Sequence, residues 1–185
     1  MQIIGGTARG TKLATPLGKT TRPTAQRSRE AMFNLLMGGR FTPSLHQAHS
    51  IDVFAGSGAI GLEALSRGAA HASFIEMDKS ACQIIQQNIK KMRVQSQSSV
   101  ISNQVAHIQH WSLPPASILF CDAPYADALS VPALTHLTAI GALQPKGLII
   151  AETHKKELLN LPDRFELKDR RIYGIAAISI FNWQS

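Results

Sequence analysis

The sequence predicts an α/β fold in which a mostly parallel sheet carries helices on both faces. From residue 51 onward, short apolar runs alternate with segments of helical periodicity, which is typical of a sheet built from β-α-β units. A glycine-rich loop at 55–61 follows the first apolar run, as in folds that hold a nucleotide where a strand ends. Two closing apolar runs around Tyr173-Gly174 indicate a β-hairpin that adds antiparallel pairing at one edge.

The same alternation predicts where each element lies. Helices are expected at 59–67, where Gly68 ends the helix, at 80–93 and at about 127–139. The middle helix is amphipathic, with its apolar residues at helical spacing: Ala81, Ile84, Ile85, Ile89 and Met92. Strands are expected at 51–54, 72–75, 100–101, 117–121 and 148–151, and the hairpin at 165–172 and 175–182.

The first forty residues differ in character from the rest. Residues 2–22 are rich in Gly, Thr and Lys and predict an irregular or hairpin-like segment. Thr24 is expected to cap a helix of about 25–37, whose inner face carries Met32, Leu35 and Leu36. A polar link at 41–50 follows. We therefore expect an N-terminal basic extension at 1–40 and a Rossmann-like catalytic domain at 41–185.

Composition and charge narrow the class of protein. The chain has 185 residues, 44% hydrophobic and 17% charged, which favours one globular domain over a disordered chain. No apolar run is long enough for a membrane span, and the two cysteines form no CxxC pair, so a reducing cytoplasm is the expected location.

Nearly all of the net charge lies on the N-terminal extension. Residues 1–40 hold seven basic side chains and one acidic side chain. Their net charge of +6 is nearly all of the +7 of the whole chain. Such a segment attracts nucleic-acid phosphates without reading sequence, although a merely solvated arm would have the same composition. The candidates for phosphate contact are Arg9, Lys12, Arg22, Arg27 and Arg29.

The glycine loop has the spacing of a nucleotide-cofactor site. Gly56, Gly58 and Gly61 follow the G-x-G-x-x-G pattern between a strand and a helix, and Glu76 stands 20 residues beyond Gly56, where a carboxylate can bind ribose hydroxyls. The spacing serves nicotinamide and S-adenosylmethionine enzymes alike, and a helix entry without a ligand remains an alternative. The candidate cofactor residues are Asp52, Phe54, Ala55, Gly56, Ser57, Gly58, Gly61, Glu76, Met77 and Asn103.

Two observations favour S-adenosylmethionine over NAD. Asp52 lies just before the loop, where an acid suits a cationic methionine end better than a pyrophosphate, and too little chain follows residue 150 for a dehydrogenase substrate domain. Two assignments stay open. Asp52 is as well suited to bond the amides of its own loop, and Asn103 could contact an adenine or cap a loop.

The turn at 122–125 carries the predicted acceptor site. The Asp122 carboxylate and the Ala123 carbonyl are adjacent acceptors for the two N–H groups of an exocyclic base amine, whose lone pair they can direct at a methyl group. Pro124 fixes the turn, and Tyr125 can stack on the base. The alternative is an ordinary strand-ending turn. The histidine pairs lack the accompanying ligands of a metal site, so we expect no metal, and we expect a monomer.

Taken together, these motifs resemble those of the bacterial 16S ribosomal RNA (guanine(966)-N(2))-methyltransferases over nearly the whole chain. The shared stretches include Ile4-Gly5-Gly6, Arg22-Pro23-Thr24, Asp52-Val53-Phe54-Ala55-Gly56-Ser57-Gly58, the run from Gly61 to Gly68, and Ile75-Glu76-Met77-Asp78. The resemblance implies a class I methyltransferase fold with strand order 3-2-1-4-5-7-6. It also implies S-adenosylmethionine as donor and a guanine 2-amino group of 16S ribosomal RNA as acceptor. We expect this RNA to be bound within a small-subunit particle, although the sequence leaves naked RNA open as the substrate.

Two residues depart from the family pattern. Ala123 stands where the family has proline in Asp-Pro-Pro-Tyr/Phe, and Gln26 stands where it has aspartate. Alanine keeps the carbonyl acceptor but loosens the turn, at a cost of about 1 kcal/mol. The rival interpretations are an N6-adenine methyltransferase on RNA or DNA, a nicotinamide oxidoreductase, and a non-catalytic RNA-binding assembly factor.

Overall fold

The fold is described from a computed structural model, which places residues 1–16, 23–124 and 129–184. Seven strands form one sheet in the order β3-β2-β1-β4-β5-β7-β6. This is the order implied by the family resemblance, so the class I methyltransferase fold is confirmed. Strands β1 (His49–Val53), β2 (His71–Glu76), β3 (Ser98–Ser102), β4 (Ala116–Asp122) and β5 (Leu143–His154) are parallel, whereas β6 (Phe165–Tyr173) and β7 (Ala176–Trp183) form the antiparallel hairpin.

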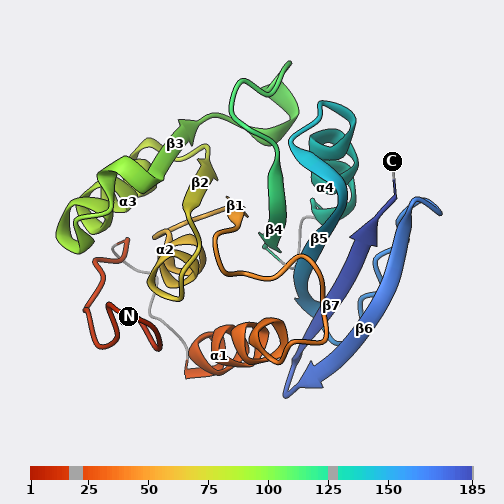
Figure 1. Cartoon of the computed structure of the whole chain (residues 1–185), viewed down its shortest axis with the longest axis horizontal. Helices are drawn as coiled ribbons and strands as arrows, with labels where there is room; N and C mark the ends of the chain where they lie inside the picture. Colours follow the sequence, from red (N-terminus) through yellow and green to blue (C-terminus); the bar gives the residue numbers. More distant parts are fainter. Residues whose placement is uncertain (17–22, 125–128, 185) are drawn as a thin grey trace.

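Helices cover both faces of the sheet (Figure 1). Helices α1 (Pro23–Met37), α2 (Ala59–Ser66) and α3 (Lys79–Met92) pack on one face, where their buried side chains share a core with Phe74 and Phe120. Helix α4 (Ser130–Ala139) and the short helix η2 (Val105–His107) pack on the other face. A second short helix, η1 (Gln95–Gln97), precedes β3. In the described residues, no helix is long and apolar enough to cross a bilayer.

The N-terminal segment packs against this core. Its side chains Ile3 and Leu13 are buried in the same cluster as Met32 and Phe33 of α1, and an isolated antiparallel bridge joins Gln2 to Lys12. The hairpin-like segment expected from the sequence is thus present over its first part. The division into 1–40 and 41–185 stays a prediction, but the described residues on its two sides share one hydrophobic core.

Several expected element boundaries were wrong in ways that have a physical cause. Helix α1 begins at Pro23, because proline is well tolerated in a first helical turn, so Thr24 lies inside the helix and is not its cap. Helix α3 begins one residue earlier than expected, since the Asp78 side chain accepts hydrogen bonds from Ser80 N and Ala81 N. Strand β5 extends well beyond 148–151 because its second half pairs with β7.

Candidate active site

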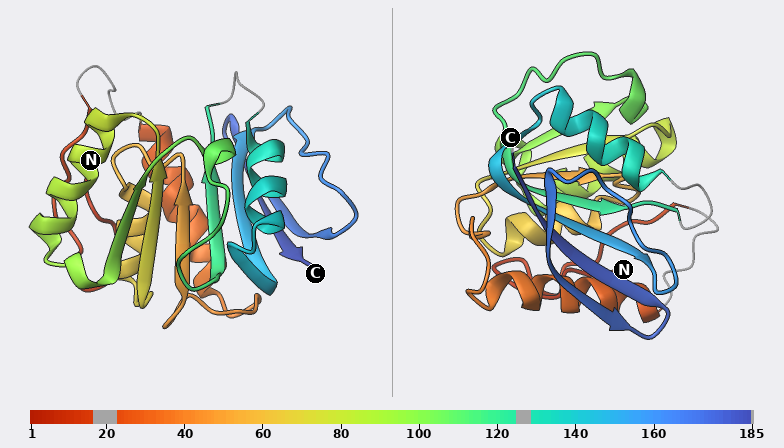
Figure 2. Two further views of the ribbon diagram at one scale, coloured as in Figure 1. Left: turned by 90° about the horizontal axis from the view of Figure 1, so that it is seen from above. Right: turned by 90° about the vertical axis from the view of Figure 1, so that its right-hand side faces the viewer.

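The carboxyl ends of the parallel strands bring the predicted site residues to one edge of the sheet (Figure 2). The glycine loop follows β1, Glu76 ends β2, and Asp122 ends β4. Ligands of open α/β sheets bind at this edge, next to the strand where the order reverses. Here the chain order reverses between β1 and β4, so the loop and Asp122 flank that point.

The glycine loop is held in a shape that only glycine adopts easily. Gly56 has a φ of 56° and Gly58 a φ of 76°, both in the left-handed region. A Cβ atom on Gly61 would lie 2.4 Å from Cε1 of Phe74, so the third glycine allows α2 to pack closely on β2. The loop therefore meets two of the requirements of the nucleotide-binding pattern, a tight turn and a close helix–strand approach.

Asp52 of β1 fixes the end of the glycine loop through a hydrogen bond. Its side chain is 1% exposed, and its Oδ2 accepts a hydrogen bond of 2.8 Å from Gly61 N. Burial raises the pKa of this carboxyl to about 8, although the Gly61 N–H opposes the shift. Of the two roles considered for Asp52, the structure shows a bond to one amide of its own loop, that of Gly61; the contact of Asp52 with a cofactor stays a prediction.

Glu76, the carboxylate expected to bind ribose hydroxyls, is held by two main-chain N–H groups. One carboxylate oxygen accepts a hydrogen bond of 2.8 Å from Gly56 N and the other accepts one of 2.9 Å from Asp78 N. The side chain is half-buried, so its orientation is fixed while part of it faces solvent. A carboxylate oxygen has two lone pairs, and each oxygen can accept a further bond from a hydroxyl group.

The other candidate cofactor residues lie around this loop. Met77 is exposed beside Glu76, Phe54 is half-buried with a φ of 62°, and Ala55 donates a main-chain hydrogen bond to Ile75 O. Ser57 is buried, with its hydroxyl directed at the Met1 sulfur at 3.6 Å. Asn103 is exposed and accepts a hydrogen bond from Gln104 N, which matches the loop-cap alternative; its contact with an adenine stays a prediction.

Asp122 and Ala123 stand at the end of β4 as expected. The Asp122 side chain has an exposed surface, Ala123 is buried, and Pro124 is exposed. Tyr125, the predicted stacking residue, lies outside the described residues. The protein packed around the Asp122 carboxyl group removes water from it, and this raises the pKa of Asp122 above its ordinary value. The negative charge of Glu152 on β5 raises that pKa further. An aspartate of this kind can exchange a proton nearer to neutral pH than an ordinary one.

The structure corrects the role expected for Arg29. This side chain is 5% exposed, donates a hydrogen bond of 2.7 Å to Gln2 O, and lies 3.9 Å from the Glu63 carboxylate. Burial lowers the pKa of the guanidinium group, and the Glu63 and Asp52 carboxylates oppose that shift. Arg29 therefore fixes the N-terminal segment and does not present its charge to a phosphate. Arg9, Lys12 and Arg27 are exposed, and Arg22 lies outside the described residues.

Sequence reasoning missed the buried polar groups that fix the N-terminal segment beside the loop. Glu63 is fully buried and accepts hydrogen bonds from Ile4 N, Gly5 N and the Arg67 Nε atom, at 2.7, 2.8 and 2.7 Å. Its signal in the sequence is that it is the one charged residue of the otherwise apolar stretch Ala59–Ser66.

A second buried anchor, Asn88 of α3, joins the N-terminal segment to the loop itself. Its side chain bonds both main-chain groups of Ala14 and also donates a hydrogen bond of 3.0 Å to Ser57 O. Because an amide side chain both donates and accepts, one residue can bridge the two segments. The N-terminal segment is consequently part of the wall around the glycine loop.

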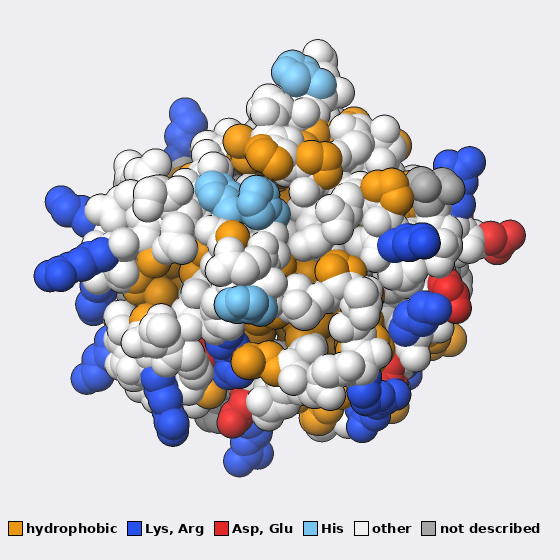
Figure 3. All heavy atoms as spheres, in the orientation of Figure 1, with side chains coloured by type: hydrophobic (Ala, Val, Ile, Leu, Met, Phe, Trp, Pro, Cys, Tyr) orange, Lys and Arg blue, Asp and Glu red, His pale blue; other side chains and the backbone are white. Residues whose placement is uncertain are grey.

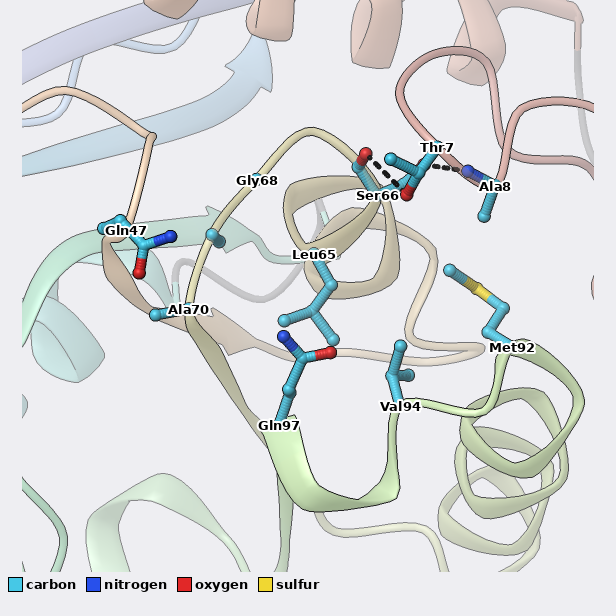
Figure 4. A pocket seen from close by; sticks show the side chains of 11 residues that line it. Thr7, Ala8, Gln47, Leu65, Ser66, Gly68, Ala70, Met92, Val94 and Gln97 are labelled. Carbon is cyan, nitrogen blue, oxygen red and sulfur yellow. Dashed lines mark hydrogen bonds between the residues drawn. The ribbon is translucent and has the colours of Figure 1, made fainter.

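Two cavities lie elsewhere on the protein. One of about 380 Å³ is lined by residues such as Leu65, Met92, Val94 and Gln97 (Figure 4), and one of about 440 Å³ lies near Pro43 and Pro115. Both are at or near the amino edge of the sheet, away from Asp122, so neither is the candidate site. No cluster of three or more metal-ligating side chains was found among the residues that the structure describes.

Comparison with known proteins agrees with this geometry. The model of the family described as "Conserved hypothetical protein 95" matches residues 1–182. A Haemophilus influenzae protein named ribosomal RNA small subunit methyltransferase D is 33% identical over 184 residues, covering 98% of this chain and 93% of the relative. The Escherichia coli K12 protein of the same name is 35% identical over 182 residues, covering 98% and 89%.

Solved structures give the same result. A structure described as the putative methyltransferase yhhF from Escherichia coli superposes with a TM-score of 0.85 at 32% sequence identity. The match covers 100% of this chain and 98% of the other. A putative methylase from Haemophilus influenzae, HI0767, follows with a TM-score of 0.80 at 30% identity, covering 100% and 98%.

Proposed function

Because the chain belongs to the conserved hypothetical protein 95 family, with the ribosomal RNA small subunit methyltransferases D among its relatives, we propose that it methylates ribosomal RNA. The acceptor is the exocyclic N2 amine of a guanine in 16S ribosomal RNA, and the donor is S-adenosylmethionine. The target nucleotide and its base are the finer part of the proposal. They rest on the family motifs and on the Asp122-Ala123 acceptor pair at the end of β4.

The residues around the glycine loop fit S-adenosylmethionine. Glu76 is oriented by two main-chain N–H groups, and Gly56 leaves open space where a side chain would otherwise stand. Glu76 would bind the ribose hydroxyls, and the main chain of Ala55–Gly58 would approach the methionine part. When bound, this donor supplies an electrophilic methyl group for direct displacement. The rival nicotinamide enzyme would need the same loop but a different acceptor site.

Asp122 and Ala123 orient the target amine. The carboxylate accepts one N–H bond and the Ala123 carbonyl accepts the other, which directs the nitrogen lone pair away from the ring plane toward the methyl group. The lone pair would form the new N–C bond with the methyl group that the bound donor supplies, and the sulfur of the donor would leave with the C–S bonding electrons. The nitrogen then carries a surplus proton. The Asp122 carboxylate, whose pKa is raised, can accept that proton.

The single observation that carries this proposal is the position of Asp122 at the end of β4, beside the glycine loop that follows β1. Incubation with methyl-labelled donor and small-subunit particles that lack the modification, followed by digestion to nucleosides, tests it. We expect labelled N2-methylguanosine. Labelled N6-methyladenosine would show that the acceptor is adenine and not guanine. If the protein binds the donor but no labelled nucleoside forms, a non-catalytic assembly factor would be favoured.

A further inference from the structure

Exposed apolar side chains gather at the edge of the sheet that carries Asp122. Among the described residues, five of the seven exposed large hydrophobic side chains lie at or next to this edge: Met77, Leu129, Leu158, Ile172 and Ile175. The exposed fractions of Leu158, Ile172 and Ile175 are 68%, 57% and 44%. Leu158, Ile172 and Ile175 lie on two segments that a main-chain hydrogen bond from Lys155 N to Ile175 O joins, so these three are candidates for one contact surface.

Three of these side chains and two lysines form one surface, here called the β5–β6 rim: Lys155, Lys156, Leu158, Ile172 and Ile175. Hydrogen bonds hold its parts together. Lys155 N donates to Ile175 O at 2.8 Å, which joins the end of β5 to the β6–β7 turn. The Arg170 side chain donates to Lys155 O at 2.8 Å and to Glu157 O at 3.3 Å. The rim is therefore a fixed surface and not a set of independent loop residues.

The β5–β6 rim adjoins the acceptor site. Glu152 of β5 is the register partner of Asp122 on β4, and Lys155 follows three residues later in the chain. A strand rises about 3.3 Å per residue, so the end of β5 at His154, directly before Lys155, lies about 7 Å beyond Glu152. The rim therefore begins within a few residues of the strand end that faces Asp122, next to the place where a target nucleotide would lie.

The charges of the rim are available to a ligand. Lys155 and Lys156 are exposed, and neither forms a salt bridge within the described residues. The neighbouring Arg171 is different, because its Nε atom lies 3.2 Å from the Asp169 carboxylate, which balances its charge. Two free cations beside an apolar surface suit a polyanion whose sugars and bases also offer flat, weakly polar faces.

We propose that the β5–β6 rim binds the backbone of the substrate RNA beside the target nucleotide. Lys155 and Lys156 contact phosphates, and Leu158, Ile172 and Ile175 pack against sugars and bases. This inference rests on the proposed function, since it assumes an RNA acceptor at Asp122. The opposite edge of the sheet has another character (Figure 3): histidine side chains gather near its middle, and lysine and arginine side chains lie around its periphery.

A pair of double variants tests the inference. Lys155→Gln/Lys156→Gln neutralises the rim, and Lys90→Gln/Lys91→Gln makes the same charge change in the last turn of α3, toward the other edge of the sheet. The probe is an unmodified 16S ribosomal RNA transcript, with binding measured over a series of salt concentrations. Two lost phosphate contacts should lower the slope of log affinity against log salt by about 1.4 for single-stranded RNA. The α3 variant should keep the parent slope.

The outcomes separate this surface from the proposed function. If the parent binds the transcript and both double variants keep its slope, or lose it equally, the rim is not the RNA surface. If the parent binds neither the transcript nor small-subunit particles, the proposed substrate fails and the rim assignment fails with it. Loss of particle binding by Ile172→Ser/Ile175→Ser, with unchanged transcript binding by every variant, would instead identify a protein partner and overturn the RNA assignment.

Discussion

Asp122 and Glu152 are direct neighbours on the parallel strands β4 and β5, where they form a register pair at the carboxyl edge of the sheet. Register partners in parallel strands point to the same face, so the two carboxylates lie on the side covered by α1, α2 and α3, as do Phe120 and Ile150. Glu152 is 8% exposed. Glu152 thus places a second acid next to Asp122, the proposed acceptor.

The pair predicts a pH dependence with a definite sign. Desolvation of the Asp122 carboxyl group by the protein packed around it, and the charge of Glu152, raise the pKa of Asp122, and the proposed role needs the ionised form. Methyl transfer should therefore fall as pH drops through that raised pKa. In Glu152→Gln the repulsion is gone, the pKa of Asp122 moves toward the ordinary value of about 3.9, and the acid limb of the pH–rate profile moves to lower pH.

Folding stability gives a readout of the same pair that does not depend on activity. Because the pKa of Asp122 is higher in the folded than in the unfolded chain, its ionisation lowers the free energy of unfolding. This loss of stability grows as pH rises and is complete above the folded-state pKa. Glu152→Gln should reduce the loss, while Glu166→Gln on the exposed face of β6 should not. An acid limb and a stability profile that both stay in place in Glu152→Gln would refute the coupling.

Loss of the buried Glu63 carboxylate, which holds the N-terminal segment, should destabilise the fold strongly. Glu63→Ala leaves the Arg67 and Arg29 guanidinium groups without their buried partner and removes the acceptor for two main-chain N–H groups. Removing one partner of a buried pair costs about 3–5 kcal/mol in the free energy of unfolding. Urea unfolding measures it, with Glu63→Gln as the milder change. A loss no larger than that of the exposed Glu166→Ala would contradict this account.

Gly61 should not accept a methyl group. The Cβ of Gly61→Ala would meet Cε1 and Cζ of Phe74 at 2.4 and 2.9 Å, and Phe74 is itself fully buried, so it has little room to move. Overpacking of this kind costs about 1–3 kcal/mol of stability. Gly38→Ala, whose Cβ has its nearest contact at 3.4 Å, is the matched control. Equal urea midpoints for the two variants would show that α2 can shift away from β2.

Local patterns in the sequence predicted much of the fold. The alternation of apolar runs and helical periods located the strands and helices, and the spacing of Gly56, Gly58 and Gly61 located the loop, because these signals depend on neighbours along the chain. The position of Asp122 at a strand end follows from the same local reasoning. The strand order came from the family resemblance and not from these patterns.

The contacts between distant segments could not be predicted in this way. Arg29 belongs to a segment whose composition is typical of a phosphate-binding arm. Tertiary packing nevertheless buries Arg29 against Gln2, 27 residues before it, and Glu63, 34 residues after it. The role of Asp52 stayed open for the same reason, since an acid before a glycine loop can face the ligand or the loop. Its bond to Gly61 N depends on how tightly α2 packs on the sheet.

The central claim, that Asp122 acts on the acceptor while the glycine loop and Glu76 hold the donor, is tested most directly by Asp122→Ala. Single-turnover methyl transfer to small-subunit particles and calorimetric titration with S-adenosylmethionine are measured on the same preparation, with the exposed Asp163→Ala as control. The account predicts a rate lower by about 10²–10³ with donor affinity unchanged, as for loss of one transition-state acceptor. A rate like that of the parent, or equal loss of donor binding, would contradict it.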